Sequence, residues 1–169
     1  MLRRSLLFFF FTVMITLAAT ASSDSSRLVY FGTYTRKDSK GIYVSRFDPA
    51  TGALAPATFA AAGANPTFIA RHPRLPVLYS IGECKNETGG TEGALFAFSI
   101  DPATGALTAL NSLPAGGPTL CYLQVAPTGR TILVSSYGGG YVASYSLSDD
   151  GRLGARVSFV KHSGKGPHP

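Results

Sequence analysis

The sequence is poor in charged residues and in cysteine. Only 14% of its 169 residues are charged, with 15 Lys and Arg against 9 Asp and Glu, and it has two cysteines. The basic residues are scattered and not interleaved with aromatics, so the excess of positive charge does not predict a nucleic-acid-binding surface. No Cys, His, Asp or Glu group has metal-ligand spacing. The sequence therefore predicts no metal, no cofactor and no nucleic-acid partner.

Two further features exclude other classes of site. The glycine run from Gly138 to Gly140 lacks the Lys-Ser/Thr that completes a phosphate-binding loop, and we interpret it as a hairpin turn. An exported protein permits a disulfide between Cys84 and Cys121. However, Cys84 starts a predicted loop and Cys121 falls in a predicted apolar inner strand. Two separate thiols are therefore favoured, with the pairing left open.

The N-terminal segment differs in composition from the rest. Residues 1–21 carry Arg3 and Arg4, then an apolar stretch with four consecutive phenylalanines, and end in Ala19-Thr20-Ala21. This is the pattern of a signal peptide, and it predicts an exported protein, periplasmic or secreted. An uncleaved anchor is the alternative, but the apolar run is short for a span of about 20 residues. We therefore expect no stable membrane span after cleavage, and residues 22–27 as a polar leader.

A seven-residue string occurs twice. Asp48-Pro49-Ala50-Thr51-Gly52-Ala53-Leu54 returns unchanged at residues 101–107, and a degraded copy covers 148–153. Each copy follows an alternating aromatic and apolar run, which fits a strand with one face toward a core. Asp-Pro favours a turn, and glycine supplies the residue that can take a positive φ. Gly52, Gly105 and Gly151 lie 53 and 46 residues apart, which is typical of a propeller or another repeat array.

Two full repeat units follow from this pattern, and together they predict an all-β protein of four-stranded propeller blades. Pro118-Thr119 in the second unit matches Pro66-Thr67 in the first. The strands expected are 67–70, 77–81, 93–100 and 107–113 in the first unit, and 122–125, 132–136, 141–147 and 155–160 in the second.

The opening unit lacks one strand. Residues 28–33 match a second strand, 42–47 a third and 56–61 a weak fourth, and the innermost strand has no counterpart. In a closed propeller the far end of the chain can supply that strand, which removes exposed edges. Propellers have roughly four to eight blades of about 50 residues each. We therefore expect residues 28–169 to be a partial propeller, two full blades and one incomplete blade of an expected seven, truncated at the C-terminus.

Several short steps are shared with one known family. They are Tyr30-Phe31-Gly32-Thr33-Tyr34-Thr35, Gly41-Ile42-Tyr43, the Asp-x-x-Thr-Gly-x-Leu turns, Asn65-Pro66-Thr67-Phe68 and Ser136-Tyr137-Gly138-Gly139-Gly140. Through them residues 28–169 resemble the lactonase family of seven-bladed β-propellers, which includes the propeller-type 6-phosphogluconolactonases. Position 136 is Ser where the family often has Asn, which leaves that local contact open.

The resemblance implies hydrolysis of a sugar lactone in carbohydrate metabolism by a full-length protein that is a monomer. It places the family's Arg-Gln pair and Pro-His-x-His-Ser step beyond residue 169, so the fragment itself is expected to be inactive. Export argues against a phosphorylated substrate, because phosphorylated sugars are expected inside cells. Two alternatives stay open: an exported, non-catalytic binding propeller, and a muconate-cyclising enzyme of the same family.

Lactone hydrolysis needs a base that activates water, and histidine suits that role near neutral pH. His168 lies in a glycine and proline loop where the next unit would begin, and it is the candidate catalytic residue. Its surroundings fit a Gly-x-Gly-Pro-x-Pro segment better than the family's His step. His162 ends a strand and is a weaker candidate, whereas His72, beside Pro73, is interpreted as a surface histidine of a turn.

Other polar residues have simpler interpretations. Arg71 and Arg130 lie beside turns, where a solvated role is expected. Glu83 begins a predicted long loop that reaches Glu92. Long loops at a propeller rim often carry binding groups, but a variable insertion is favoured here. The loop contains the sequon Asn86-Glu87-Thr88, which matters only in a eukaryotic secretory route.

Overall fold

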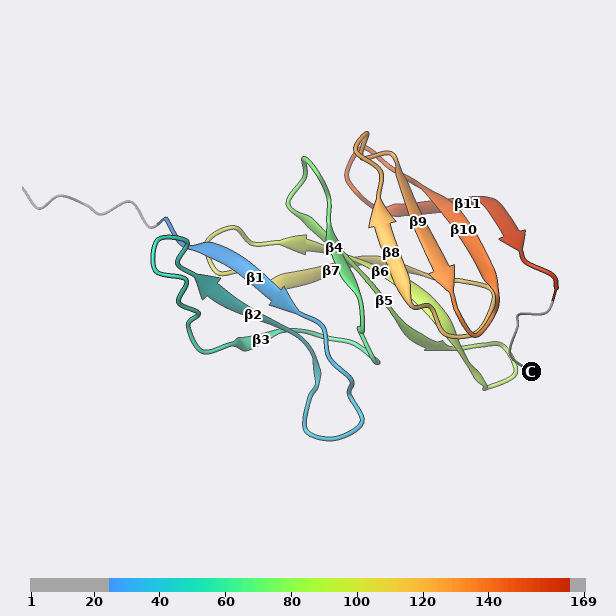
Figure 1. Ribbon diagram of the computed structural model, residues 1–169, viewed down its shortest axis with the longest axis horizontal. Coiled ribbons are helices and arrows are strands. Elements are labelled where there is room, and N and C mark those ends of the chain that lie inside the picture. The colour runs from blue at the N-terminus through green and yellow to red at the C-terminus, as the bar shows by residue number, and fades with distance from the viewer. Residues whose placement is uncertain (1–24, 165–169) are drawn as a thin grey trace, which may run out of the picture.

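The computed structural model describes residues 25–164, and within them the chain forms three antiparallel sheets. The sheets lie side by side in chain order (Figure 1). The expected signal peptide and His168 fall outside the described residues. No helix among the described residues is long and apolar enough to cross a membrane.

Each sheet corresponds to one repeat unit, as the sequence predicts. The first has three strands, β1 (Arg27–Phe31), β2 (Gly41–Phe47) and β3 (Thr58–Ala62). The second is ordered β4 (Ile69–Arg71), β5 (Val77–Lys85), β6 (Thr91–Ile100) and β7 (Leu107–Pro114). The third is ordered β8 (Tyr122–Val125), β9 (Thr131–Ser136), β10 (Tyr141–Leu147) and β11 (Leu153–Lys161). The prediction of two full blades and one lacking its inner strand is confirmed.

The inner strands β4 and β8 are neighbours, as expected for strands around a propeller hub. The ring of Phe68, just before β4, lies 4.7 Å from the ring of Tyr122 at the start of β8, measured between centroids. The inner strands of two successive blades therefore lie next to each other, and β4 is the edge strand of its sheet.

The middle blade is packed on both faces. Along β5, Tyr79 and Ile81 belong to a core shared with the third blade, whereas Leu78 belongs to a core shared with the first. On β6, Leu95 belongs to the core shared with the third blade, and Phe98 belongs to the core shared with the first. Successive side chains of a strand point to opposite faces, so the nearly continuous apolar runs of β5 and β6 fill two cores at once.

The repeated turn fits against the preceding blade. Gly105 and Gly151 have φ of 78° and 84°, values that favour glycine. A Cβ at Gly105 would lie 2.9 Å from Val44 of the first blade, and one at Gly151 would lie 2.8 Å from Val77 of the second. The turn glycine is thus required both for its backbone conformation and for close approach between blades.

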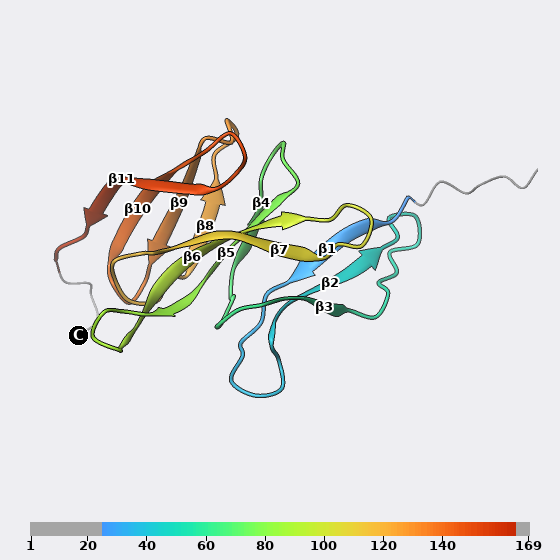
Figure 2. The same cartoon turned by 180° about the vertical axis from the view of Figure 1, so that it is seen from behind.

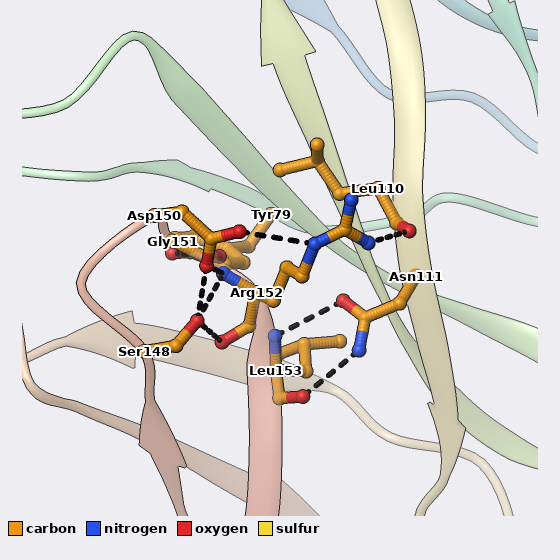
Figure 3. A network of polar contacts seen from close by, with 8 residues as sticks. All are labelled: Tyr79, Leu110, Asn111, Ser148, Asp150, Gly151, Arg152 and Leu153. Atoms are coloured by element: carbon orange, nitrogen blue, oxygen red, sulfur yellow. Dashed lines mark hydrogen bonds and ion pairs between the residues drawn. The ribbon is translucent and has the colours of Figure 1, made fainter.

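At each of these two contacts between blades, a tyrosine of the preceding blade binds the backbone of the turn glycine. The hydroxyl of Tyr30 donates to the carbonyl of Gly105 at 2.9 Å, and that of Tyr79 donates to Gly151 at 2.7 Å. Around the second junction, the side chain of Asn111 both donates to and accepts from the backbone of Leu153, as Figure 3 shows. The same contact thus recurs at both junctions between neighbouring blades.

The prediction of a long loop between Glu83 and Glu92 is wrong. Residues 83–85 pair with 91–93, so β5 and β6 continue as a hairpin, and only residues 86–90 form the turn. The turn is closed by the Asn86 side chain, which accepts from the backbone of Thr88 at 3.2 Å, and by Gly89 at a φ of 80°. Because this stretch is polar, the sequence pattern did not indicate that it contains the end of β5 and the start of β6.

Tyr79 should make stability fall at alkaline pH. Burial, and to a lesser extent Asp150, raises the pKa of Tyr79 to about 12 from an ordinary value of 10.0. The folded state therefore holds this proton more tightly than the unfolded state. The resulting stability is complete below pH 10 and is lost as pH rises toward 12, by up to about 3 kcal/mol. Urea unfolding of the Tyr79→Phe variant should show a shallower decline over this range than the wild type. Equal declines would contradict the assignment.

Candidate functional site

Five chain connections lie on the same side of the three sheets. The chain passes from an outer strand to the next inner strand at residues 63–68 and 115–121, and the turns at 32–40, 86–90 and 137–140 join the second and third strands of each blade. All five lie along the lower edge of the molecule in Figure 1, and Figure 2 shows the same rim from behind. Loops held by a rigid sheet scaffold are the usual place for binding groups.

A cleft of about 420 Å³ opens on this rim, and we call it the hub cleft. It receives residues from every blade, so it is a product of the assembled sheets and of no single motif. Its lining residues are Tyr34, Arg36, Asn65, Thr67, Gly82, Glu83, Thr119, Leu120, Cys121, Tyr137 and Gly138.

Asn65 fastens the first blade to the second at this cleft. Its Oδ1 accepts from the backbone N–H of Thr35 at 2.9 Å, and its own N–H donates to the Thr35 hydroxyl at 3.1 Å. Its φ of 49° is a conformation that asparagine tolerates better than most residues. The Asn-Pro-Thr step therefore acts as a clamp, and it holds Thr67 at the cleft.

Ser136 fastens the segment that leads into β8 to the end of β9 within the third blade. Its Oγ lies 2.9 Å from the carbonyl of Thr119, to which it can donate, and it accepts from the N–H of Gly139 at 2.9 Å. Ser136 is buried, and residues 137–140 form the hairpin turn that the sequence predicts. Serine thus holds the turn at this position.

The hub cleft carries one carboxylate and one guanidinium. Half-buried Glu83 contributes the carboxylate, and Arg36 lies 5.5 Å from the centre of the Tyr34 ring in a cation–π contact. Tyr34 and Tyr137 are 65% and 92% exposed. This set can accept from and donate to the hydroxyls of a sugar while offering aromatic surface. Sequence reasoning gave no role to Tyr34, Arg36 or Tyr137, although tyrosines in glycine-rich turns were a signal of exposed aromatics.

The interpretation of His72 as a surface histidine is wrong. It is 4% exposed, its Nε2 lies 3.0 Å from the carbonyl of Gly129, and its Nδ1 accepts from the backbone N–H groups of Arg74 and Leu75. Since Nδ1 accepts, Nε2 carries the proton and donates. His72 closes its own turn and ties it to the matching turn of the third blade.

The remaining predicted residues lie apart from the hub cleft. His162 is exposed just after β11, where its N–H donates to the carbonyl of Gly140 at 2.8 Å. Arg71 and Arg130 are exposed, as expected for solvated residues. Within residues 25–164, no group of three or more His, Cys, Asp or Glu side chains could hold a metal ion.

The two cysteines are separate thiols, as expected, but their surroundings differ from the prediction. Cys121 is exposed and lines the hub cleft just before β8, whereas Cys84 lies within β5 with its sulfur 3.9 Å from Glu92. Burial, followed by the nearby Glu92 carboxylate, raises the pKa of Cys84. The two thiols should therefore differ in reactivity.

Iodoacetamide at neutral pH is expected to label Cys121 several-fold faster than Cys84, as followed by peptide mass spectrometry. The Cys84 rate should rise at higher pH, where its thiolate forms. Glu92→Gln should narrow the difference, because it removes the charge that opposes the Cys84 thiolate. Protection of both residues until a reductant is added would instead reveal a disulfide.

Comparison with known proteins identifies the fold as that of a class of β-propeller hydrolases. Residues 28–169 match the family described as lactonase, 7-bladed beta-propeller. The chain belongs to this family.

The relatives agree with this assignment. A 6-phosphogluconolactonase of Bacillus subtilis is 37% identical over 139 residues, which cover 82% of this chain and 38% of that protein. The crystal structure of a candidate 6-phosphogluconolactonase of Bacteroides fragilis has a TM-score of 0.76 at 30% identity, over 88% of this chain and 40% of that one. A periplasmic gluconolactonase of Pseudomonas aeruginosa has a TM-score of 0.71 at 28% identity, over 81% and 39%. The chain thus spans about 40% of the length of the relatives it matches.

Proposed function

We propose that the whole protein hydrolyses a sugar lactone and that the hub cleft is part of its active site. The observation that carries this proposal is the cleft itself, which sets Glu83, Arg36 and two threonine hydroxyls around one space in a chain of the lactonase family. The acidic and hydroxyl groups suit the ring hydroxyls of a sugar, and Arg36 suits an oxygen that carries negative charge.

His168 is proposed as the base. In the sequence repeat, Pro167-His168 takes the place of Pro66-Thr67 and Pro118-Thr119, and both of those threonines line the hub cleft. A histidine at this step would take a proton from water as the water oxygen bonds to the lactone carbonyl carbon. The ring C–O bond then breaks, and the proton passes to the released alkoxide, which gives the free hydroxy acid.

The proposed substrate is an unphosphorylated sugar lactone met outside the cytoplasm, in the periplasm or after secretion. Two observations support this. The first 21 residues have the pattern of a signal peptide. One of the structural relatives is a periplasmic gluconolactonase.

Hydrolysis assays of the intact protein test the proposal. Glucono-lactone and 6-phosphogluconolactone are each followed by acid release, with heat-denatured protein as the control for spontaneous opening. We expect turnover of both, with kcat/KM at least tenfold higher for the unphosphorylated compound. Preference for the phosphorylated lactone would contradict the substrate assignment. Binding without turnover would show that the protein is a non-catalytic binding propeller. Activity on a muconate alone would show that it is a muconate-cyclising enzyme.

A further inference from the structure

A second cleft lies between the middle and third blades at their outer strands. Its volume is about 620 Å³, and we call it the outer cleft. One wall is the β5–β6 turn, with Asn86 and Glu87, together with Glu92 near the start of β6. The other wall is β10 and β11, with Tyr145 and Arg156. Leu113 and Pro114 at the end of β7 supply an apolar surface. Both blades around it are complete.

The outer cleft exists because the outer strand of the third blade departs from the repeat. The pairing of β10 with β11 shifts register on both sides of Tyr145, whose partner is Arg156. In the middle blade, β6 and β7 shift register only once, between Ala97 and Phe98. Arg156 thus lies where the pairing of the third blade's outer strand is irregular.

Arg156 is held in place by groups other than a carboxylate. Its guanidinium carbon lies 4.9 Å from the centre of the Phe159 ring. Gly116 makes room for it, since a Cβ there would lie 2.9 Å from Nη1 of Arg156. Arg156 also shares a side-chain hydrogen bond with Tyr145, and the five N–H groups of a guanidinium leave further donors for a ligand.

Arg156 and Glu92 both line the outer cleft and form no ion pair with each other. Burial raises the pKa of Tyr145, the Arg156 charge opposes that shift, and the Glu92 charge adds to it. Both charged groups therefore act on the same phenol. Among the described residues the ion pair recorded joins Arg152 to Asp150, and none joins Arg156 to Glu92.

We propose that the outer cleft binds a sugar acid, a small carboxylate that carries several hydroxyls. Its carboxylate bonds to the fork of Arg156, its hydroxyls donate to Glu92 and Glu87, and its carbon chain lies on Leu113 and Pro114. The two glutamates disfavour an anion with several charges, such as phosphate, and favour a ligand rich in donors. This inference goes beyond lactone hydrolysis at the hub and stands without it.

Calorimetric titration of the intact protein with sodium gluconate tests the proposal. We expect millimolar or tighter binding, with acetate, which lacks the hydroxyls, and glucitol, which lacks the carboxylate, at least tenfold weaker. Arg156→Leu, which removes the charge and the hydrogen-bond donors of the guanidinium, should weaken gluconate binding about tenfold or more. Arg130→Leu removes the same charge from an exposed turn elsewhere and should leave binding unchanged.

The proposal is overturned by no gluconate binding by the wild type, by acetate binding as tight as gluconate binding, or by equal losses in Arg156→Leu and Arg130→Leu. Gluconate held only at the hub would leave binding by Arg156→Leu unchanged, which also overturns it. Circular dichroism checks the folding of each variant. If Arg156→Leu does not fold, Arg156→Lys keeps the charge without the fork and should still weaken binding several-fold. Lactone turnover is measured in parallel, and its absence bears only on the function proposed for the hub.

Discussion

His168→Gln in the intact protein is expected to lower kcat for lactone hydrolysis by about 100- to 10,000-fold, with little change in KM. Glutamine keeps a hydrogen-bonding side chain of similar reach but cannot take a proton from water near neutral pH. The wild-type rate should fall at acid pH, because the ordinary pKa of histidine is about 6.5 and the protonated ring is no base. The variant should lose that dependence along with the rate. The measurement is a set of initial rates across pH on a sugar lactone.

Two matched variants show whether the loss belongs to His168. His162→Gln changes the same residue type six positions earlier, outside the hub cleft, and should keep the wild-type rate. Glu83→Gln removes the carboxylate that lines the cleft and should cost roughly tenfold, mainly in KM, since it weakens contact with substrate hydroxyls. Normal activity in His168→Gln with a large kcat loss in Glu83→Gln would assign the base to Glu83 instead.

His72→Ala is expected to destabilise the fold by about 2 to 4 kcal/mol. The substitution leaves the Gly129 carbonyl and the N–H groups of Arg74 and Leu75 without their partner, and it opens a cavity at a side chain that is 4% exposed. Urea denaturation measures this as a lower midpoint.

His72→Asn separates the two halves of this interaction. An asparagine Oδ1 can accept from the N–H groups two and three residues on, in the manner of an Asx turn. This variant should therefore lose the bond to Gly129 while keeping the turn, at a cost of about 1 kcal/mol. A surface histidine would give changes within about 0.5 kcal/mol for both variants, and that result would contradict the buried role.

The repeat carried most of the fold prediction, because its physical requirements are local. Gly105 takes a positive φ in the turn, and the aromatic and apolar run along 93–100 indicates a strand. The hairpin at 83–93 was missed for the opposite reason. Its strand ends are polar and project beyond the core, so their pairing depends on register set further along β5 and β6.

The candidate site was only partly predictable. Glu83 was noticed for its place in the chain, but its contribution to the hub cleft depends on the packing of three blades. The burial of His72 likewise depends on a partner 57 residues away. A pattern of neighbours in sequence cannot specify such distant contacts. The tyrosines at 34 and 137 could have been found by asking which aromatic residues fall in turns, where no core would cover them.

The packing of the middle blade on both faces also has a kinetic meaning. In a tandem array each unit is stabilised by its own strands and by its nearest neighbours. Backbone amides in β5 and β6, which are largely buried, would therefore exchange with solvent more slowly than those of β7, the more exposed outer strand of the same blade.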